Sequence, residues 1–313
     1  MGTVHDTVLR IRQRVAALGH GNWLLAVSGG MDSMVLLGAA AETLSHNALA
    51  VATFDHGTGP AARAAAALVA ERALDLGIGC ICGRAAAAGR TESEWRAARW
   101  SFLNDVSSRL GATVVTAHTL DDQIETVFIR ALRGAGPRGL AGLFAASPVA
   151  RPLLETTRAE IAEYAGGDKT VFATDPSNAD RTHLRNRVRL DLLPAFERAS
   201  PGFSLALLDI AEKASTWRAR MEALALIFPM MGNSPESRSF ERHPLRGFPV
   251  ESLGFLWPAL CARAGIILNR RGTERLAEFT IKGETGQQIQ LSGGVSVHME
   301  RQAITFRSAT ANG

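Results

Sequence analysis

The first 120 residues alternate short apolar runs with longer stretches of helical periodicity. The apolar runs have the length and unbroken hydrophobicity of strands that are covered on both faces. They lie at residues 22–27, 48–54, 78–82 and 112–117. The helical stretches between them cover residues 33–45, 61–76 and 91–110. This alternation predicts an α/β fold with a doubly wound parallel sheet of the Rossmann-like kind.

The pattern changes after the fourth apolar run. Residues 133–143 are rich in glycine and arginine, which predicts a mobile loop. A further strand near 149–154 and a helix from Thr157 are expected to follow.

Beyond Pro201 the strand–helix alternation stops. Two helical stretches and a closing set of short strands are expected there, at residues 202–230, 250–280 and 287–306. We therefore expect a first domain at 1–200 and a smaller domain of helices and strands at 201–313.

The composition is that of an ordinary globular protein. With 313 residues, 46% of them hydrophobic and 20% charged, a disordered or fibrous chain is excluded. No apolar run reaches the roughly 18–20 residues that a membrane span needs. Residues 1–21 lack the apolar core of a signal peptide, so a cytoplasmic protein without a membrane partner is expected.

The cysteines and the charge add little on their own. Cys80, Cys82 and Cys261 are an odd number without framework spacing, which fits a reducing compartment. Cys80 and Cys82 lie in an apolar run, so burial in a strand is favoured over metal binding. The net charge is +4, with 31 arginines and only three lysines. Coding bias explains that excess as well as phosphate binding by arginine does.

A phosphate-binding loop is predicted at residues 28–33, Ser-Gly-Gly-Met-Asp-Ser, between the first strand and the first helix. Two glycines allow a close approach of the backbone to a ligand, and the helix N-terminus attracts an anion. The segment is not a Walker A loop, because it lacks the Gly-Lys-Ser/Thr ending.

Two further polar motifs follow strands. Asp55, His56 and Gly57 come directly after the second strand, and residues 118–126, His-Thr-Leu-Asp-Asp-Gln-Ile-Glu-Thr, come directly after the fourth. The carboxyl ends of parallel strands line one crevice, so the three motifs are expected to meet in a single cleft.

Acidic residues at the start of the next helix have two interpretations. Thr119 has the character of an N-cap, which places Asp121 and Asp122 in the first turn, where they would stabilise the helix dipole by about 0.3–1 kcal/mol. Asp122 and Glu125 lie three residues apart and share a face. Beside a phosphate site, carboxylates also suit Mg²⁺, so metal and substrate binding with Asp32 is favoured.

Two arginine-rich segments are candidates for binding phosphate. Glu92, Arg96 and Arg99 share one face of a predicted helix, where a solvated salt-bridged face is an equal alternative. Residues 175–178, Asp-Pro-Ser-Asn, precede a segment with four arginines in nine residues, 181–189. Such a basic run without acids is typical of nucleic-acid contact.

Taken together, these motifs resemble the tRNA(Ile)-lysidine synthetases of the PP-loop ATP pyrophosphatase superfamily. The resemblance runs from about Leu24 to Glu197 and includes all the motifs above. It also covers residues 133–142 and the Arg-Pro-Leu-Leu segment at 151–154. The departures are Thr-Gly-Pro at 58–60, where the family has Leu-Arg-Pro, and Trp100, where it has Tyr; Arg63 is a candidate for the missing arginine.

The resemblance implies a two-step reaction. ATP adenylates the wobble cytidine of tRNA(Ile) with a CAU anticodon, and free L-lysine then displaces AMP to give lysidine. It implies ATP and Mg²⁺, with Asp32 and Asp122 as metal ligands. It also implies that residues 1–200 are the ATP-binding catalytic domain and that residues 201–313 bind tRNA or another substrate. The sequence does not decide whether the protein forms a homodimer. The implied nucleotide-binding residues are Ala26, Ser28, Gly29, Gly30, Met31, Asp32, Ser33, Asp55 and His56. The implied catalytic residues are Asp32, His118, Asp122, Glu125 and Arg185. The implied tRNA-contact residues are Glu92, Arg96, Arg99, Arg133, Arg138, Arg181 and Arg189.

Two alternatives remain from the sequence. A tRNA thiolation enzyme could use the same fold, although Cys80 and Cys82 have the wrong spacing for a Cys-x-x-Cys pair. A non-catalytic nucleotide sensor would not need the arginine-rich segment or a second domain. With lysine present, an enzyme should release pyrophosphate when tRNA is added, whereas a sensor would release none.

Overall fold

The computed structural model describes residues 4–85, 91–174, 179–233 and 237–308. The chain divides into two compact units, Met1–Ser215 and Thr216–Gly313. The division lies inside helix α10 (Phe203–Ala225), not near residue 200 as expected. The reason is that the first half of α10 belongs to the first core, where Leu207 and Ala211 pack with Phe128 and Val188.

The first unit is built on a four-stranded parallel sheet with the strand order β3-β2-β1-β4. The strands are β1 (Trp23–Ala26), β2 (Leu49–Asp55), β3 (Gly79–Arg84) and β4 (Thr113–Thr116). The connecting helices are α2 (Met31–Thr43), α3 (Pro60–Asp75) and α4 (Glu92–Leu110). The predicted doubly wound parallel sheet is thus confirmed. Helix α4 begins with a capping box in which the Thr91 hydroxyl accepts from the Glu94 amide.

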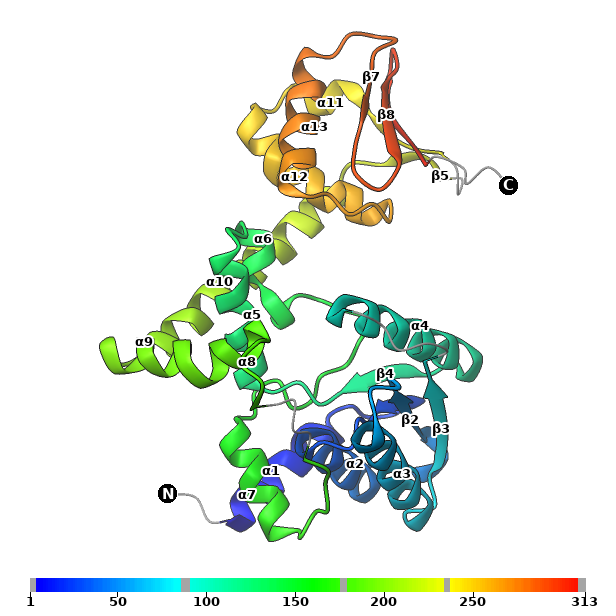
Figure 1. The fold of residues 1–313 in the computed structure, drawn as a ribbon. Helices are drawn as coiled ribbons and strands as arrows, with labels where there is room; N and C mark the ends of the chain where they lie inside the picture. Colours follow the sequence, from blue (N-terminus) through cyan, green and yellow to red (C-terminus); the bar gives the residue numbers. More distant parts are fainter. Residues whose placement is uncertain (1–3, 86–90, 175–178, 234–236, 309–313) are drawn as a thin grey trace. The chain divides into compact units, whose positions relative to one another are not determined.

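Helices cover both faces of this sheet (Figure 1). On one face, α1 (Val4–Ala16), α2, α3 and α7 (Arg158–Gly167) pack on Leu25, Val51 and Val115. On the other face, Leu103 and Val106 of α4 pack on the strand residues whose side chains point to that side of the sheet. The chain order reverses between β1 and β4, which places a ligand crevice at their carboxyl ends.

The segment after the sheet differs from the sequence prediction. Residues 133–143 are not simply a loop, because they contain a short helix α6 (Pro137–Leu140) and the start of a 3-10 turn η2 (Gly142–Phe144). The strand expected near 149–154 is reduced to one parallel bridge between Val115 and Ala150. Proline at Pro148 and Pro152 lacks the N–H that a longer ladder would require.

Four helical segments complete the first unit besides α10. They are the short 3-10 helix η1 (His46–Ala48), α5 (Leu120–Leu132), α8 (Leu184–Arg187) and α9 (Leu193–Ala199). A π-helical stretch, η4 (Val188–Leu192), joins α8 to α9. The helix predicted from Thr157 is α7, and the Thr157 hydroxyl caps it.

The cysteine prediction is wrong for one residue. Because β3 is an edge strand, Cys82 is exposed and Cys80 is half-buried, whereas the apolar run predicted burial of both. Cys261 is buried in the second unit.

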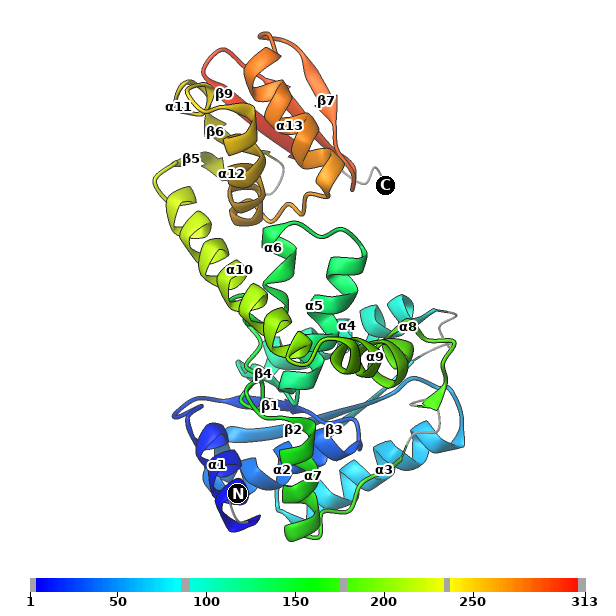
Figure 2. The same cartoon turned by 90° about the vertical axis from the view of Figure 1, so that its left-hand side faces the viewer.

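The second unit packs helices on a five-stranded antiparallel sheet with the order β5-β6-β9-β8-β7 (Figure 2). The strands are β5 (Met230–Asn233), β6 (Ser237–Glu241), β7 (Gln288–Gln290), β8 (Val295–Met299) and β9 (Ala303–Ser308). The helices are α11 (Arg242–Arg246), α12 (Val250–Arg263) and α13 (Arg270–Lys282). Trp257 of α12 is fully buried against Phe240 and Phe306. The closing strands were predicted, but β5 and β6 were not. Among the described helices, none is long and apolar enough to cross a membrane.

Candidate active site

A cavity of about 620 Å³ opens at the carboxyl ends of the parallel strands. Its wall comes from the ends of β1, β2 and β4 and from α3, α4, α7 and η4, so segments more than 160 residues apart in the chain meet there. Of the predicted site residues, it is lined by Ala26, Ser28, Gly30, Met31, Asp32, Ser33, His56, Arg99, His118, Asp122 and Arg189. The expected convergence of three motifs on one cleft is confirmed.

The loop between β1 and α2 has the geometry of an anion site. Helix α2 begins at Met31 without a side-chain cap, so its first N–H groups are available to a ligand. Gly29 has φ 88°, and a Cβ there would come within 2.9 Å of the Ala65 carbonyl, which explains why this position requires glycine. The Ser33 hydroxyl donates to the Gly30 carbonyl at 2.8 Å and accepts from the Ser28 amide at 3.2 Å, which fixes the loop.

The end of β2 contributes one of its two predicted residues. His56 lines the cavity, and burial, followed by the nearby Arg99, lowers its pKa. Asp55 is not among the lining residues. Its carboxylate accepts from the Gly57 amide at 2.8 Å and lies 3.5 Å from Arg84 Nε, so it shapes the turn after β2.

Asp122 both caps a helix and faces the cavity. Its Oδ2 accepts from the Thr119 amide at 2.9 Å and from the Thr119 hydroxyl at 3.1 Å, as the capping interpretation predicted. Its Oδ1 lies 3.6 Å from Arg158 and 4.0 Å from Arg185. Burial alone would raise the pKa of Asp122, but the Thr119 amide and these arginines outweigh it and lower the pKa. The group is therefore a carboxylate at neutral pH.

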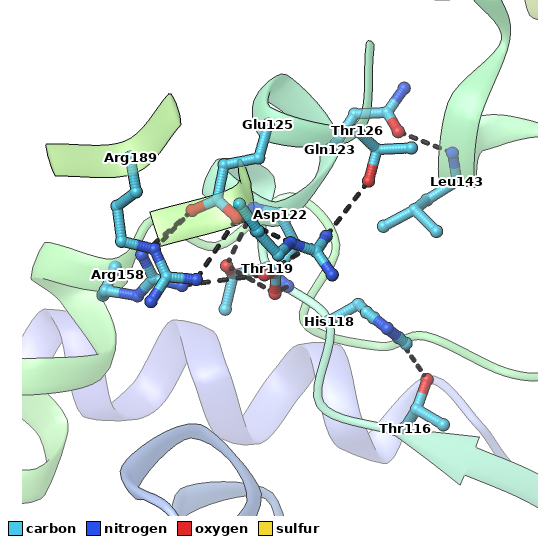
Figure 3. Close-up of polar contacts among 11 residues, drawn as sticks. Thr116, His118, Thr119, Asp122, Gln123, Glu125, Thr126, Leu143, Arg158 and Arg189 are labelled. Atoms are coloured by element: carbon cyan, nitrogen blue, oxygen red, sulfur yellow. Dashed lines mark hydrogen bonds and ion pairs between the residues drawn. The ribbon is translucent and has the colours of Figure 1, made fainter. Parts of the chain in front are cut away.

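His118 is held neutral next to this carboxylate. Its Nδ1 forms a hydrogen bond of 2.8 Å with the Thr116 hydroxyl (Figure 3). Burial lowers its pKa to about 4; Asp122 opposes this shift, and the arginines Arg151, Arg185 and Arg99 add to it. An added anion would offset those arginines and raise the pKa again.

Asp32 is the acid at the start of α2. Burial raises its pKa, Asp122 and Asp121 add to this effect, and Arg158 and Arg189 oppose it. Asp32 and Asp122 both line the cavity, but no group of three or more metal-ligating side chains occurs within the described ranges. Two carboxylates suit Mg²⁺, which takes one or two carboxylates and completes its shell with phosphate and water.

Glu125 is buried beneath the cavity with three arginines around it. Its side chain is only 2% exposed, and Arg158, Arg185 and Arg189 all donate to it (Figure 3). Both oxygens of Glu125, a catalytic residue in the resemblance, are therefore occupied by arginines. Arg185 also donates to the Thr126 hydroxyl at 3.2 Å.

The predicted tRNA-contact residues fall into different places. Arg99 lines the cavity, and its buried Nε has no hydrogen-bond partner in the described part of the chain. Arg96 is exposed on α4, whereas the side chain of Glu92 lies outside the described residues. Arg133 is exposed, Arg138 is half-buried in α6, and Arg181 pairs with Asp191 at 3.1 Å. The exposed Arg63 does not line the cavity.

The arginines of residues 181–189 do not form one tRNA-facing helix surface. The sequence predicts that Arg181, Arg185 and Arg189 follow one helical face, but α8 begins only at Leu184, so Arg181 lies before the helix. Arg185 and Arg189, four residues apart, do share a face, and both donate to Glu125 in the interior. The motif at 175–178 lies outside the described residues.

Sequence reasoning missed two residues of the site. Arg158 lines the cavity and is the first residue of α7, where a cation opposes the helix dipole; that unfavourable position was the available signal. Gln123 is fully buried, and its amide donates to the Ala141 carbonyl at 3.1 Å and accepts from the Leu143 amide. A buried glutamine gives no sequence signal without knowledge of the fold.

A second cavity of about 250 Å³ adjoins the first. It is lined by Asp121, Ile124, Glu125, Arg158, Arg189, Leu193, Pro194, Glu197 and Ser204. Arg158 and Arg189 thus contribute to both cavities. The second one combines three acids with two arginines.

Comparison with known proteins assigns the chain. The family model of the PP-loop domain matches residues 4–196. A tRNA(Ile)-lysidine synthase of a Bradyrhizobium strain is 39% identical over 91% of this chain and 89% of its own. That of Salinispora arenicola is 33% identical over 91% of this chain and 90% of its own. The chain belongs to the tRNA(Ile)-lysidine synthase family of PP-loop proteins.

Solved structures support the fold alone. A U34-tRNA thiolase from Methanococcus maripaludis aligns with a TM-score of 0.54 at 17% identity, over 68% of this chain and 78% of its own. The match to the PP-loop domain implies that the chain binds ATP.

Proposed function

We propose that the two adjoining cavities carry out lysidine synthesis on tRNA(Ile), with ATP and the wobble cytidine in the larger one and free lysine in the smaller one. The observation that carries this proposal is the convergence of the uncapped α2 N-terminus, Asp32, His118 and Asp122 on a single cavity. A cavity of about 620 Å³ lies within the usual size range for a site that holds a nucleotide-sized ligand.

We expect the phosphates and the base of ATP to bind different parts of the larger cavity. The free amides at the start of α2 and the Ser28 and Ser33 hydroxyls take the phosphates. Asp32 and Asp122 would hold Mg²⁺, which supplies charge neutralisation to the phosphates when it is bound. Apolar lining from Phe54, Trp100 and Leu103 suits an aromatic base.

The reaction has two balanced steps. In the first, the O2 oxygen of the cytosine bonds to the α-phosphorus of ATP, and the bond to pyrophosphate breaks. In the second, the ε-nitrogen of lysine bonds to C2, and AMP leaves with the former O2 oxygen. Arg99, Arg158 and Arg189 line the cavity and stabilise the negative charge that the first step shifts onto pyrophosphate.

The lysine ammonium must lose protons as it attacks. His118 is neutral in the free protein and takes a proton once bound phosphate has raised its pKa from about 4. The smaller cavity suits lysine, because Asp121 and Glu197 attract its ammonium groups and the two shared arginines attract its carboxylate. The cytosine must leave its stack to react, which an anticodon loop permits.

The function is tested by incubation with ATP, lysine and tRNA, followed by mass analysis of the nucleosides. We expect lysidine only when lysine is present. Pyrophosphate release should require tRNA but not lysine, because adenylation comes first. Asp32→Asn should lower the rate of pyrophosphate release by at least about 100-fold.

A matched control is Asp105→Asn, which removes an acid that pairs with Arg109 on the exposed face of α4. It should keep the wild-type rate. Pyrophosphate release without tRNA, or lysidine formation at the wild-type rate by Asp32→Asn, would rule out this assignment of the site. Asp121→Asn should raise the KM for lysine without changing the first step.

A further inference from the structure

The carboxylate of Glu125 uses its full hydrogen-bonding capacity on neighbouring arginines, which leaves none for a substrate. Its Oε1 accepts from Arg189 Nε at 2.6 Å and from Arg158 Nη1 at 3.4 Å. Its Oε2 accepts from Arg185 Nε at 2.9 Å and from Arg189 Nη2 at 3.2 Å. A carboxylate offers about four lone-pair sites, and four N–H donors fill them. No acceptor position remains for an ammonium group or a cation.

The three arginines approach from different segments of the chain. Arg158 starts α7, Arg185 lies in α8 and Arg189 lies in η4, while Glu125 is in the middle of α5. Figure 3 shows Arg158 and Arg189 together on one side of the carboxylate. A single buried anion thus fixes guanidinium groups from three elements.

The side chains of the three arginines are only partly covered by the protein. Their side chains are 26%, 33% and 27% exposed, against 2% for Glu125. Arg158 and Arg189 line the larger cavity, and both act on the charge of Asp32 at the phosphate loop. The open surfaces of Arg158 and Arg189 therefore face the cavity proposed for the ATP phosphates, and Arg185 lies beside it, 4.0 Å from Oδ1 of Asp122.

We propose that Glu125 is a positioning residue that holds Arg158, Arg185 and Arg189 in place for the triphosphate of ATP, and that it binds neither metal nor lysine itself. The inference rests on the proposed function, since it concerns the adenylation step of that reaction. Three guanidinium groups placed together repel one another, so they require a shared counter-charge when no phosphate is bound. Glu125 supplies it without competing for the cavity.

The test measures adenylation alone. The rate of pyrophosphate release is followed in a single turnover, with enzyme in excess over tRNA and lysine omitted. Glu125→Gln keeps the size of the side chain but loses the charge that gathers the arginines. We expect the rate at saturating ATP to fall about 100-fold, because small displacements of positioned groups have effects of this order. The KM for ATP should not rise, since the local positive charge increases.

Two further variants separate positioning from other roles. The double variant Glu125→Gln/Arg158→Gln should release pyrophosphate only slightly more slowly than Glu125→Gln alone, because Glu125 acts through its arginines. Glu163→Gln is the matched control, since this glutamate accepts a hydrogen bond from Thr7 between α1 and α7 away from the cavity. It should leave the rate unchanged. If Glu125→Gln does not fold, Glu125→Asp takes its place, with the same expected loss.

The outcomes are distinct. A Glu125→Gln protein that releases pyrophosphate at the wild-type rate but needs much more lysine for lysidine formation would overturn the proposal, because Glu125 would then be a lysine ligand. Fully additive losses in the double variant would overturn it as well. A wild-type protein that releases no pyrophosphate with tRNA would instead refute the proposed function.

Discussion

At the residue scale, the chemistry of the site depends on how burial divides similar side chains among different tasks. Asp32, Asp122 and Glu125 are all acids near the phosphate loop, yet only the first two line the larger cavity. Glu125 is below it and saturated by arginines. The sequence places Asp32 after the first strand and the other two acids after the fourth. Which of their oxygens are free is decided by tertiary packing, which no local pattern predicts.

His118 should make the stability of the protein depend on pH. Its pKa is about 4 in the folded chain against an ordinary value of 6.5, so the unfolded chain binds the proton more readily between these values. The contribution of His118 to the free energy of unfolding is therefore fully present above about pH 6.5. As the pH falls toward 4, the free energy of unfolding decreases by up to about 3 kcal/mol. Urea unfolding at several pH values should show a weaker dependence for His118→Gln. Parallel curves for the two proteins would contradict the burial of a neutral His118.

Cys80 and Cys82 should be dispensable for the reaction. Their Sγ atoms lie 4.0 Å apart on the edge strand β3, and burial, followed by the neighbouring Cys82, raises the pKa of Cys80 to about 12. A thiol with such a pKa is a poor nucleophile at neutral pH. The double variant Cys80→Ser/Cys82→Ser should form lysidine at the wild-type rate in the nucleoside assay. A folded but inactive double variant would contradict this view and favour chemistry at sulfur.

At the element scale, the parallel sheet and its connections follow from the sequence, but the connections beyond β4 do not. Continuous apolar runs and glycine stops mark each strand and helix of the first 120 residues, because both signals are local. The α6–η2 segment owes its structure to Gln123, a buried side chain of α5 that bonds to Ala141 and Leu143. That Arg189 turns inward to Glu125 is decided by the packing of η4 on α5, which is also not visible as a local pattern.

Gly142 tests how tightly α5 fixes this connection. Gly142 and Gly134 both have positive φ, 59° and 68°, so alanine strains the backbone at either site by about 1–3 kcal/mol. At Gly142 a Cβ would also come within 2.4 Å of Gln123 Oε1, whereas at Gly134 it meets nothing within 4 Å. Gly142→Ala should therefore lower the free energy of unfolding by at least about 1 kcal/mol more than Gly134→Ala. Equal losses in chemical denaturation would mean that Gln123 does not hold the turn.

At the scale of the whole molecule, the excess of arginine has two separate uses. Arg158, Arg185 and Arg189 are engaged inside the first unit by one carboxylate. Others, such as Arg63 and Arg133, are exposed. Exposed side chains of this kind are accessible to the backbone of a large RNA. The net charge of +4 thus understates how unevenly positive charge is distributed over the chain.

Exposed arginines of the first unit should set the salt dependence of tRNA binding without affecting the chemistry. Each phosphate contact that is lost lowers the slope of log affinity against log salt concentration by about 0.7–0.9. The double variant Arg133→Gln/Arg181→Gln should therefore reduce this slope by up to about twice that amount, one step for each lost contact. The slope is measured by filter binding over a range of salt concentrations. Turnover at saturating tRNA should stay at the wild-type value, because neither side chain lines the larger cavity. By contrast, Arg158→Gln should leave the slope unchanged while turnover falls, since its guanidinium acts on ATP. A double variant with an unaltered slope would show that tRNA phosphates are bound elsewhere on the protein.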